Sequence, residues 1–174
     1  EVPLEWDETK NIVWKTPIPG RGHGSPSIVS DSIFIATADQ QTQTQSVISF
    51  DRSTGNQEWI TQVHANGWEG RIHKRNTQAS TTVACDGERV FAVFMYDEAI
   101  WLTALSLEGS ILWQVQASDF VSHWGYSTSP VLYKVLVIIA SDHKGGGNRI
   151  SCDPRTGVQV WNAERPAIPN YASP

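Results

Sequence analysis

The chain has 174 residues, of which 40% are hydrophobic, and this is enough for one domain with a sizeable core. Charged residues make up 18%, and the formal net charge of −5 gives no electrostatic basis for binding nucleic acid or an anionic membrane surface. The longest apolar run, at 135–140, is far too short for a transmembrane segment. The sequence opens on Glu1 without a basic and apolar leader, so we expect any signal peptide to be absent from it.

Two sequence markers repeat along the chain. Four of the eight tryptophans recur roughly every 50 residues, a spacing typical of propeller blades or solenoid units. A second marker precedes the later three of them and reads GSPSIV, ASTTVA and TSPVLY, with a partial copy, ASP, at 172–174. Because the two markers alternate throughout, the chain is predicted to be built from one repeated unit.

Each unit is predicted to contain four strands. The Ser-Pro marker leads into runs such as SIFIATAD, RVFAVFMYD and VLVIIASD, which are rich in β-branched and aromatic residues. A third strand, a turn and a fourth strand with the Trp follow. In chain order, we predict the last strand of an incomplete blade over 1–20, blades over 21–64, 76–117 and 125–164, and the start of a further blade over 170–174.

A polar turn precedes each Trp. In the first and last copies it begins with Asp, whose carboxylate can accept hydrogen bonds from backbone N–H groups of the turn. A Gly at its end supplies the positive φ, and the Trp always follows four residues later, so its ring reaches the same point in every sheet. The middle copy has Ser106 in place of Asp, and we expect its hairpin to be looser. The positions of this structural repeat are Trp14, Asp51, Gly55, Trp59, Gly109, Trp113, Asp153, Gly157 and Trp161.

One four-stranded sheet cannot cover its own two faces, and radial stacking on neighbouring sheets solves this problem. We therefore predict an all-β fold, a partial β-propeller of about three four-stranded antiparallel blades. Three blades leave two open sheet faces, which predicts exposed apolar surface and a tendency to associate.

Cys85 and Cys152 have neither metal-ligand nor redox-pair spacing and are predicted to be buried free thiols.

The candidate binding site lies in the loops between strands. All five histidines are expected in loops that emerge on one face, and the longest of these, VHANGWEGRIHKRN at 63–76, is rich in His, Trp, Arg and Asn. These are also ordinary loop residues that can act as local hydrogen-bond partners. The candidate binding residues are His23, His64, Trp68, His73, Arg75, His123, Trp124, Asp142 and His143.

Two further hypotheses concern the same loops, namely a metal site and a phosphate-binding loop. His73, His123 and the Asp142–His143 pair could approach one another near the ring axis and hold a metal, although they have no compact ligand spacing. KGGGN at 144–148 lacks the helix of a phosphate-binding loop and is predicted to be a flexible hairpin.

We expect Gly55→Val to destabilise its blade and His64→Ala to leave the fold intact.

The pattern Asp-x-x-Thr-Gly-x-x-x-Trp, preceded by a Ser-Pro strand, resembles the quinoprotein-like (PQQ-like) β-propeller repeat. This repeat occurs in quinoprotein alcohol dehydrogenases and in the BamB-like propeller lipoprotein of the outer-membrane barrel assembly machinery. The resemblance covers nearly the whole chain and implies a ring of seven or eight blades. It therefore implies a fragment whose remaining blades come from a longer chain or, alternatively, from self-association. It also implies a bacterial protein in the periplasm or outside the cell.

The function expected from these features is that of a non-enzymatic scaffold, which binds an unknown protein or polymer through its loop-rich face. No catalytic motif is present, so no residue is predicted to be catalytic. The alternative is a segment of a PQQ-dependent quinoprotein oxidoreductase. Such enzymes use an adjacent cysteine pair, whereas Cys85 and Cys152 are far apart, so we expect neither PQQ nor Ca²⁺ in this segment. A third alternative is a metal-binding face built from the loop histidines.

Overall fold

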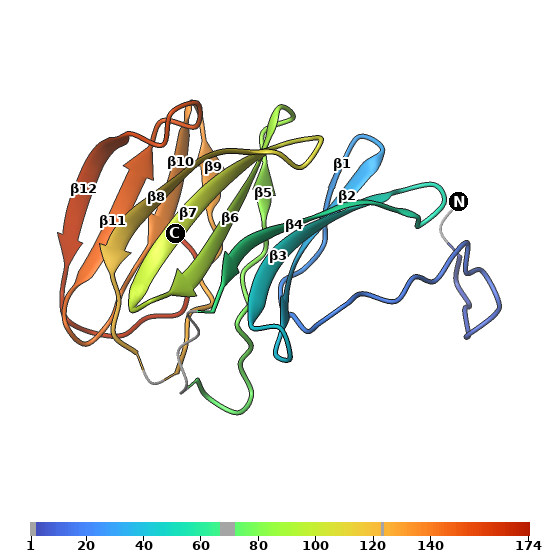
Figure 1. Ribbon diagram of the computed structural model, residues 1–174, viewed down its shortest axis with the longest axis horizontal. Coiled ribbons are helices and arrows are strands. Elements are labelled where there is room, and N and C mark those ends of the chain that lie inside the picture. The colour runs from blue at the N-terminus through green and yellow to red at the C-terminus, as the bar shows by residue number, and fades with distance from the viewer. Residues whose placement is uncertain (1–2, 67–71, 123) are drawn as a thin grey trace.

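The computed structural model describes residues 3–66, 72–122 and 124–174, and within them the chain forms three four-stranded antiparallel sheets and no helix (Figure 1). The first sheet contains β1 (Ser27–Val29), β2 (Ser32–Asp39), β3 (Thr44–Asp51) and β4 (Gln57–Ala65). The second contains β5 (Ala84–Cys85), β6 (Arg89–Tyr96), β7 (Ala99–Ser106) and β8 (Ile111–Asp119). The third contains β9 (Val131–Tyr133), β10 (Leu136–Ala140), β11 (Gly147–Cys152) and β12 (Gln159–Arg165). The predicted partial β-propeller is confirmed.

The sheets stand side by side in chain order, and two hydrophobic cores fill the spaces between them (Figure 1). The middle sheet contributes to both cores, because alternate residues of a strand point to opposite faces. In β6, Phe94 packs toward the first sheet, whereas Phe91 and Val93 pack toward the third. This two-sided burial explains why β6 is a continuous apolar run instead of an alternating pattern.

The repeated Trp joins each blade to the next one. The indole Nε1 of Trp59 donates a hydrogen bond to the backbone oxygen of Leu107 at 2.8 Å, in the turn of the second sheet. Trp113 donates in the same way to Pro154 of the third sheet at 3.0 Å. The rings lie against the turn glycines, so that a Cβ atom built on Gly109 would be 2.6 Å from Trp59. The glycine thus provides both its positive φ of 88° and the space for the neighbouring ring.

The Ser-Pro marker forms a second set of links, near the short first strands. The backbone N–H of Ser25 donates to the Thr82 hydroxyl, that of Thr82 to the Ser129 hydroxyl, and that of Ser129 to the Ser173 hydroxyl, each at 2.9 Å. Each marker hydroxyl therefore accepts from the blade before it. Both repeated markers seen in the sequence therefore form hydrogen bonds between adjacent blades.

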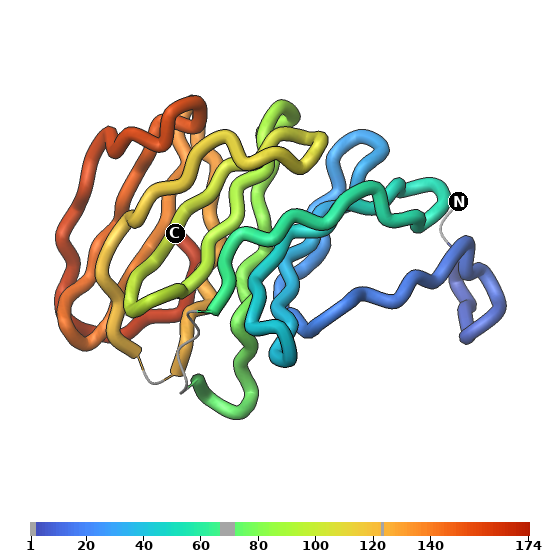
Figure 2. The backbone as a smooth tube through the Cα atoms, in the orientation of Figure 1, coloured from blue at the N-terminus to red at the C-terminus, as the bar shows by residue number. Residues whose placement is uncertain are grey.

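The segment before β1 is extended but forms no regular strand, although a strand was predicted within 1–20 (Figure 2). A strand requires a hydrogen-bonded partner, and none of the described strands pairs with residues 3–20. Trp14 nevertheless docks on the first sheet, with its Nε1 2.9 Å from the backbone oxygen of Arg52. The first strands of the three sheets begin at 27, 84 and 131, and the last strands end at 65, 119 and 165.

The outer sheets expose apolar side chains, as expected for faces that have no neighbouring blade. On the third sheet, Val158 and Val160 are 64% and 55% exposed, and Trp161 is 37% exposed. On the first sheet, an apolar pocket of about 280 Å³ lies between Trp14 and Ile33. Cys85 is partly buried and Cys152 buried, and both are free thiols. Burial raises the pKa of the Cys152 thiol to about 11, which makes it unreactive near neutral pH.

Candidate binding face

The blades have two ends that differ in their connections. We call one end the turn face, which carries residues 30–31, 52–56, 86–88, 107–110, 134–135 and 153–158 (upper end in Figure 1). The opposite end is the loop face, which carries residues 40–43, 72–78, 97–98, 120–122, 124–127 and 141–146. The loop face contains the longer and more varied connections. Two residues of the predicted site, Trp68 and His123, lie outside the described residues.

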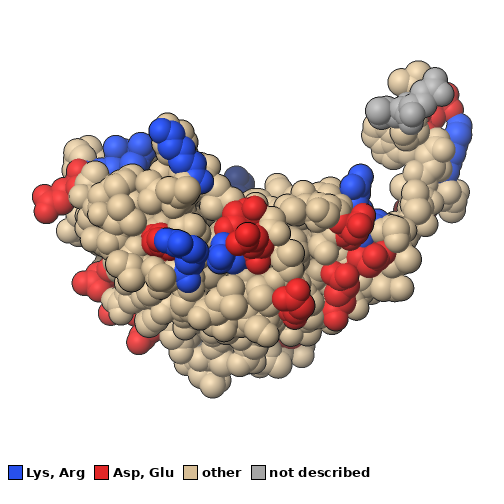
Figure 3. Space-filling view, turned by 90° about the horizontal axis from the view of Figure 1, so that it is seen from above, with Lys and Arg blue, Asp and Glu red and all other residues tan. Residues whose placement is uncertain are grey.

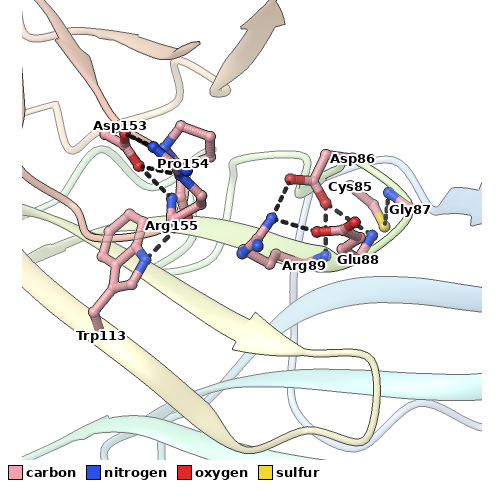
Figure 4. Close-up of polar contacts among 9 residues, drawn as sticks. All are labelled: Cys85, Asp86, Gly87, Glu88, Arg89, Trp113, Asp153, Pro154 and Arg155. Carbon is pink, nitrogen blue, oxygen red and sulfur yellow. Dashed lines mark hydrogen bonds and ion pairs between the residues drawn. The ribbon is translucent and has the colours of Figure 1, made fainter. Parts of the chain in front are cut away.

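Figure 3 views the molecule from above, onto the turn face, where both acidic and basic side chains lie, and some of these are paired within or beside their turns (Figure 4). Arg89 contacts Asp86 at 3.1 Å and Glu88 at 3.0 Å, and Arg155 contacts Asp153 at 3.1 Å. The Asp51 carboxylate accepts hydrogen bonds from its own turn, chiefly from the Ser53 and Thr54 hydroxyls, and these lower its pKa to about 2. In the middle turn the Ser106 hydroxyl accepts only two N–H groups, as expected for a weaker cap. The ion pairs and hydrogen bonds of these side chains therefore stabilise the turns in which they lie.

The prediction that His64 lies in a loop is wrong. It belongs to β4, is 7% exposed, and stacks on Tyr96 with ring centroids 4.3 Å apart. The residue is in the strand because β4 continues through a bulge to pair Gln45 with His64. Its Nε2 has no hydrogen-bond partner among the described residues. His64→Ala, predicted from the sequence to be harmless, would instead open a cavity beside Tyr96 and Trp101.

Acid should destabilise the protein through His64. Burial lowers the pKa of His64 from 6.5 to about 4, so the folded protein holds it neutral. The unfolded chain binds the proton first, and stability that is complete above pH 6.5 should fall by roughly 3 kcal/mol as the pH drops to 4. Urea unfolding across this range would measure the loss. In His64→Phe, stability should depend less on pH over the same interval, and an unchanged dependence would contradict this assignment.

Asp142 and His143 occupy the β10–β11 hairpin and are only 4% and 8% exposed. Both Asp142 oxygens accept from Nε of Arg165, at 3.0 and 3.2 Å, so this carboxylate is already neutralised. The Nδ1 atom of His143 accepts the backbone N–H groups of Val121 and Gly145. Among the described residues, no three His, Cys, Asp or Glu side chains form a group that could hold a metal ion.

The fold brings the predicted site residue Trp124 close to two others, because it lines a small pocket with His143 and its ring lies beside that of His73. The ring centroids of His73 and Trp124 are 4.9 Å apart, although these residues come from loops before different sheets. Asn76 Nδ2 donates to the backbone oxygen of Trp124 at 2.7 Å, which fixes the two loops to each other. The Arg75 N–H donates to His73 Nδ1, and the Arg75 side chain is exposed. His23 is exposed on the segment leading to β1, where its N–H donates to the backbone oxygen of Ala79.

A pocket of about 320 Å³ opens on the loop face between the first and second sheets. The sequence analysis singled out only His73 of its lining. Arg21 was missed because a bridge to Ala38, with N···O distances of 2.8 and 3.0 Å, places it there, and nothing in the local sequence marks such a pairing. Lys74 could have been found as a neighbour of His73. The polar and charged side chains of the lining are Arg21, Gln40, Gln43, His73, Lys74, Asn76, Thr77 and Gln78.

The repeat is also recognised by comparison with known families. The family described as "Outer membrane protein assembly factor BamB" matches residues 4–94 and 65–173. The chain belongs to this family. A comparison of the chain with curated proteins finds no match.

Solved structures of BamB-like and dehydrogenase propellers share the fold. BamB from Moraxella catarrhalis superposes with a TM-score of 0.60 at 14% identity, over 90% of this chain and 44% of that one. A europium-containing methanol dehydrogenase gives 0.62 at 15% identity, over 88% and 26%. Quinohemoprotein alcohol dehydrogenase from Comamonas testosteroni gives 0.60 at 16% identity, over 87% and 22%. The BamB-like chain therefore spans less than half the length of each of these proteins.

Proposed function

We propose that this chain is a non-enzymatic scaffold, whose blades hold the loop face rigid for binding a protein or polymer partner. The observation that carries the proposal is the contrast between the two ends of the blades. On the turn face, Arg89 and Arg155 are paired with carboxylates of their own turns, whereas on the loop face a pocket is lined by cationic and amide groups and by no Asp or Glu among the described residues. Rigid scaffolds that present varied loops are the usual architecture of binding proteins. The BamB-like family makes a protein partner the first choice.

The oxidoreductase alternative requires PQQ and Ca²⁺, and the residues present do not fit them. Cys85 is in β5 and Cys152 in β11, on different sheets, so they cannot form the adjacent pair that lies against PQQ in the quinoprotein dehydrogenases. The buried carboxylate of Asp142 already accepts from Arg165. We propose that this segment binds neither group. The third hypothesis, a metal face of histidines, lacks support in the described residues, because no three His, Cys, Asp or Glu side chains gather there and Nδ1 of His143 already accepts two backbone N–H groups.

We further propose that the protein acts in the bacterial periplasm or outside the cell, in keeping with the BamB-like family. No helix that could cross a membrane occurs in the part of the chain that the structure describes. The apolar faces around Trp14 and Trp161 fit a neighbouring blade of the same kind, supplied by a longer chain or by another copy.

Site-specific photocrosslinking tests the scaffold proposal. A photoreactive phenylalanine analogue at Val121, which is 56% exposed on the loop face, should give a discrete adduct in cell-envelope extracts of the source bacterium. The same analogue at Glu108, which is exposed on the turn face, is the matched control and should give none. Equal adducts from both positions, or none from Val121, would contradict the proposal. Dye reduction by the chain with PQQ, Ca²⁺ and an alcohol would favour the oxidoreductase instead.

A further inference from the structure

We propose that the loop-face pocket binds an acidic peptide segment, with its carboxylates between Arg21 and Lys74. This inference rests on the proposed scaffold function and specifies the chemistry of the partner. Three properties of the pocket support it, namely its charge, the anchoring of its walls and its partly apolar lining.

The pocket is cationic within an acidic protein. Arg21 and Lys74 line it, whereas no Asp or Glu does so among the described residues. Neither cation takes part in an ion pair within the described part of the chain, so both are available to an anionic ligand. An arginine and a lysine that line the same pocket suit a carboxylate, since the guanidinium can bind both of its oxygens. The net charge of −5 repels any anion outside the pocket, so it disfavours a long polyphosphate such as a nucleic acid more than a short segment with few carboxylates.

The walls of the pocket are held by backbone hydrogen bonds that leave the cationic side chains available. On one side, Arg21 is paired with Ala38 of β2 through both of its backbone groups. On the other side, the backbone N–H of Asn76 donates to the backbone oxygen of His73 at 2.7 Å. The side-chain amide of Asn76 donates to the backbone oxygen of Trp124. A ligand would therefore meet a preformed site and would not have to order these loops.

The lining also contains Ala38 and Ile72, which give the pocket an aliphatic part beside its charges. A free carboxylate ion would leave that part unused, whereas a peptide with an acidic residue next to an aliphatic one would cover both. A volume of about 320 Å³ suits a few residues of an extended peptide.

Fluorescence anisotropy tests this inference with the whole chain and a fluorescein-labelled heptapeptide of alternating aspartate and leucine. Binding should weaken at least tenfold in the double variant Arg21→Gln/Lys74→Gln. It should stay within twofold of wild type in Arg155→Gln/Lys134→Gln, which removes two exposed cations from the turn face. The same heptapeptide with asparagine in place of aspartate should bind at least tenfold more weakly, and added salt should weaken binding of the acidic peptide.

Equal binding by the two double variants, equal binding of the asparagine peptide, or no binding of the acidic peptide would overturn the inference. Tighter binding of a labelled oligothymidylate than of the peptide would also overturn it, in favour of a phosphate ligand. The photocrosslink at Val121 does not depend on Arg21 or Lys74. A crosslink with no peptide binding would therefore refute the acidic ligand alone, and loss of both would refute the scaffold function too.

Discussion

Gly109→Ala should lower the free energy of unfolding by about 3–4 kcal/mol, because the alanine Cβ meets both a backbone and a packing penalty. The backbone is at φ 88°, which an L-residue resists. In addition, the Cβ would be 2.6 Å from the Trp59 ring. The ring must therefore move away and lose the 2.8 Å hydrogen bond from its Nε1 to the backbone oxygen of Leu107. Urea unfolding followed by circular dichroism gives the change directly.

Gly87→Ala is the matched control for this prediction. Gly87 has a similar φ of 92°, but a Cβ built on it would have no atom within 4 Å. The control should therefore lose only the backbone part, about 1 kcal/mol. If the two variants lost equal stability, the Trp–Gly contact would not be what holds adjacent blades together. Gly55→Val should be less damaging than Gly109→Val, because its neighbour Trp14 lies on a segment outside the sheets and can move away.

Arg165→Leu should lower the free energy of unfolding by about 3 kcal/mol, because it leaves the Asp142 carboxylate buried without its partner. Asp142 is 3% exposed in its side chain and bonds Arg165 through both oxygens. Arg155→Leu removes an Asp–Arg pair of the same kind from the turn face, where the arginine is 71% exposed. That control should leave the free energy of unfolding nearly unchanged, because water screens an exposed ion pair.

The double variant Arg165→Leu/Asp142→Asn identifies the cause of the loss. It removes the buried charge together with its partner, so it should recover most of the stability lost in Arg165→Leu. The three proteins can be compared by urea unfolding at pH 7. If Arg165→Leu and Arg155→Leu were equally stable, or if the double variant recovered nothing, the buried charge of Asp142 would not be the reason for the destabilisation.

The fold could be predicted because the same residues recur in register. The Asp-x-x-Thr-Gly-x-x-x-Trp pattern shows where one turn ends and the next strand begins, and the apolar runs show which strands are covered on both faces. The sequence could not show where the Trp ring binds. Trp59 follows Gly55 by four residues, yet the ring of Trp59 lies on Gly109 of the next blade. That contact depends on the angle between two sheets, which no local pattern encodes.

The site was harder to predict than the fold. Counting loop histidines located the loop face, but strand β4 extends far enough to bury His64, and the β10–β11 hairpin buries Asp142 with Arg165. The pocket depends instead on Arg21, whose position comes from a bridge to Ala38, and on Lys74 from the facing loop. Side chains that meet across two blades leave no spacing signal, because the distance between them in the sequence is set by an entire sheet.

Hydrogen–deuterium exchange of the chain, with and without the partner captured by the Val121 crosslink, tests most directly the claim that the loop face is the binding surface. The scaffold account predicts slower exchange at 40–43 and 72–78 on that face when the partner is bound. It predicts no change at 107–110 and 153–158 on the turn face. Protection at the turn face, with the loop face unchanged, would contradict the account.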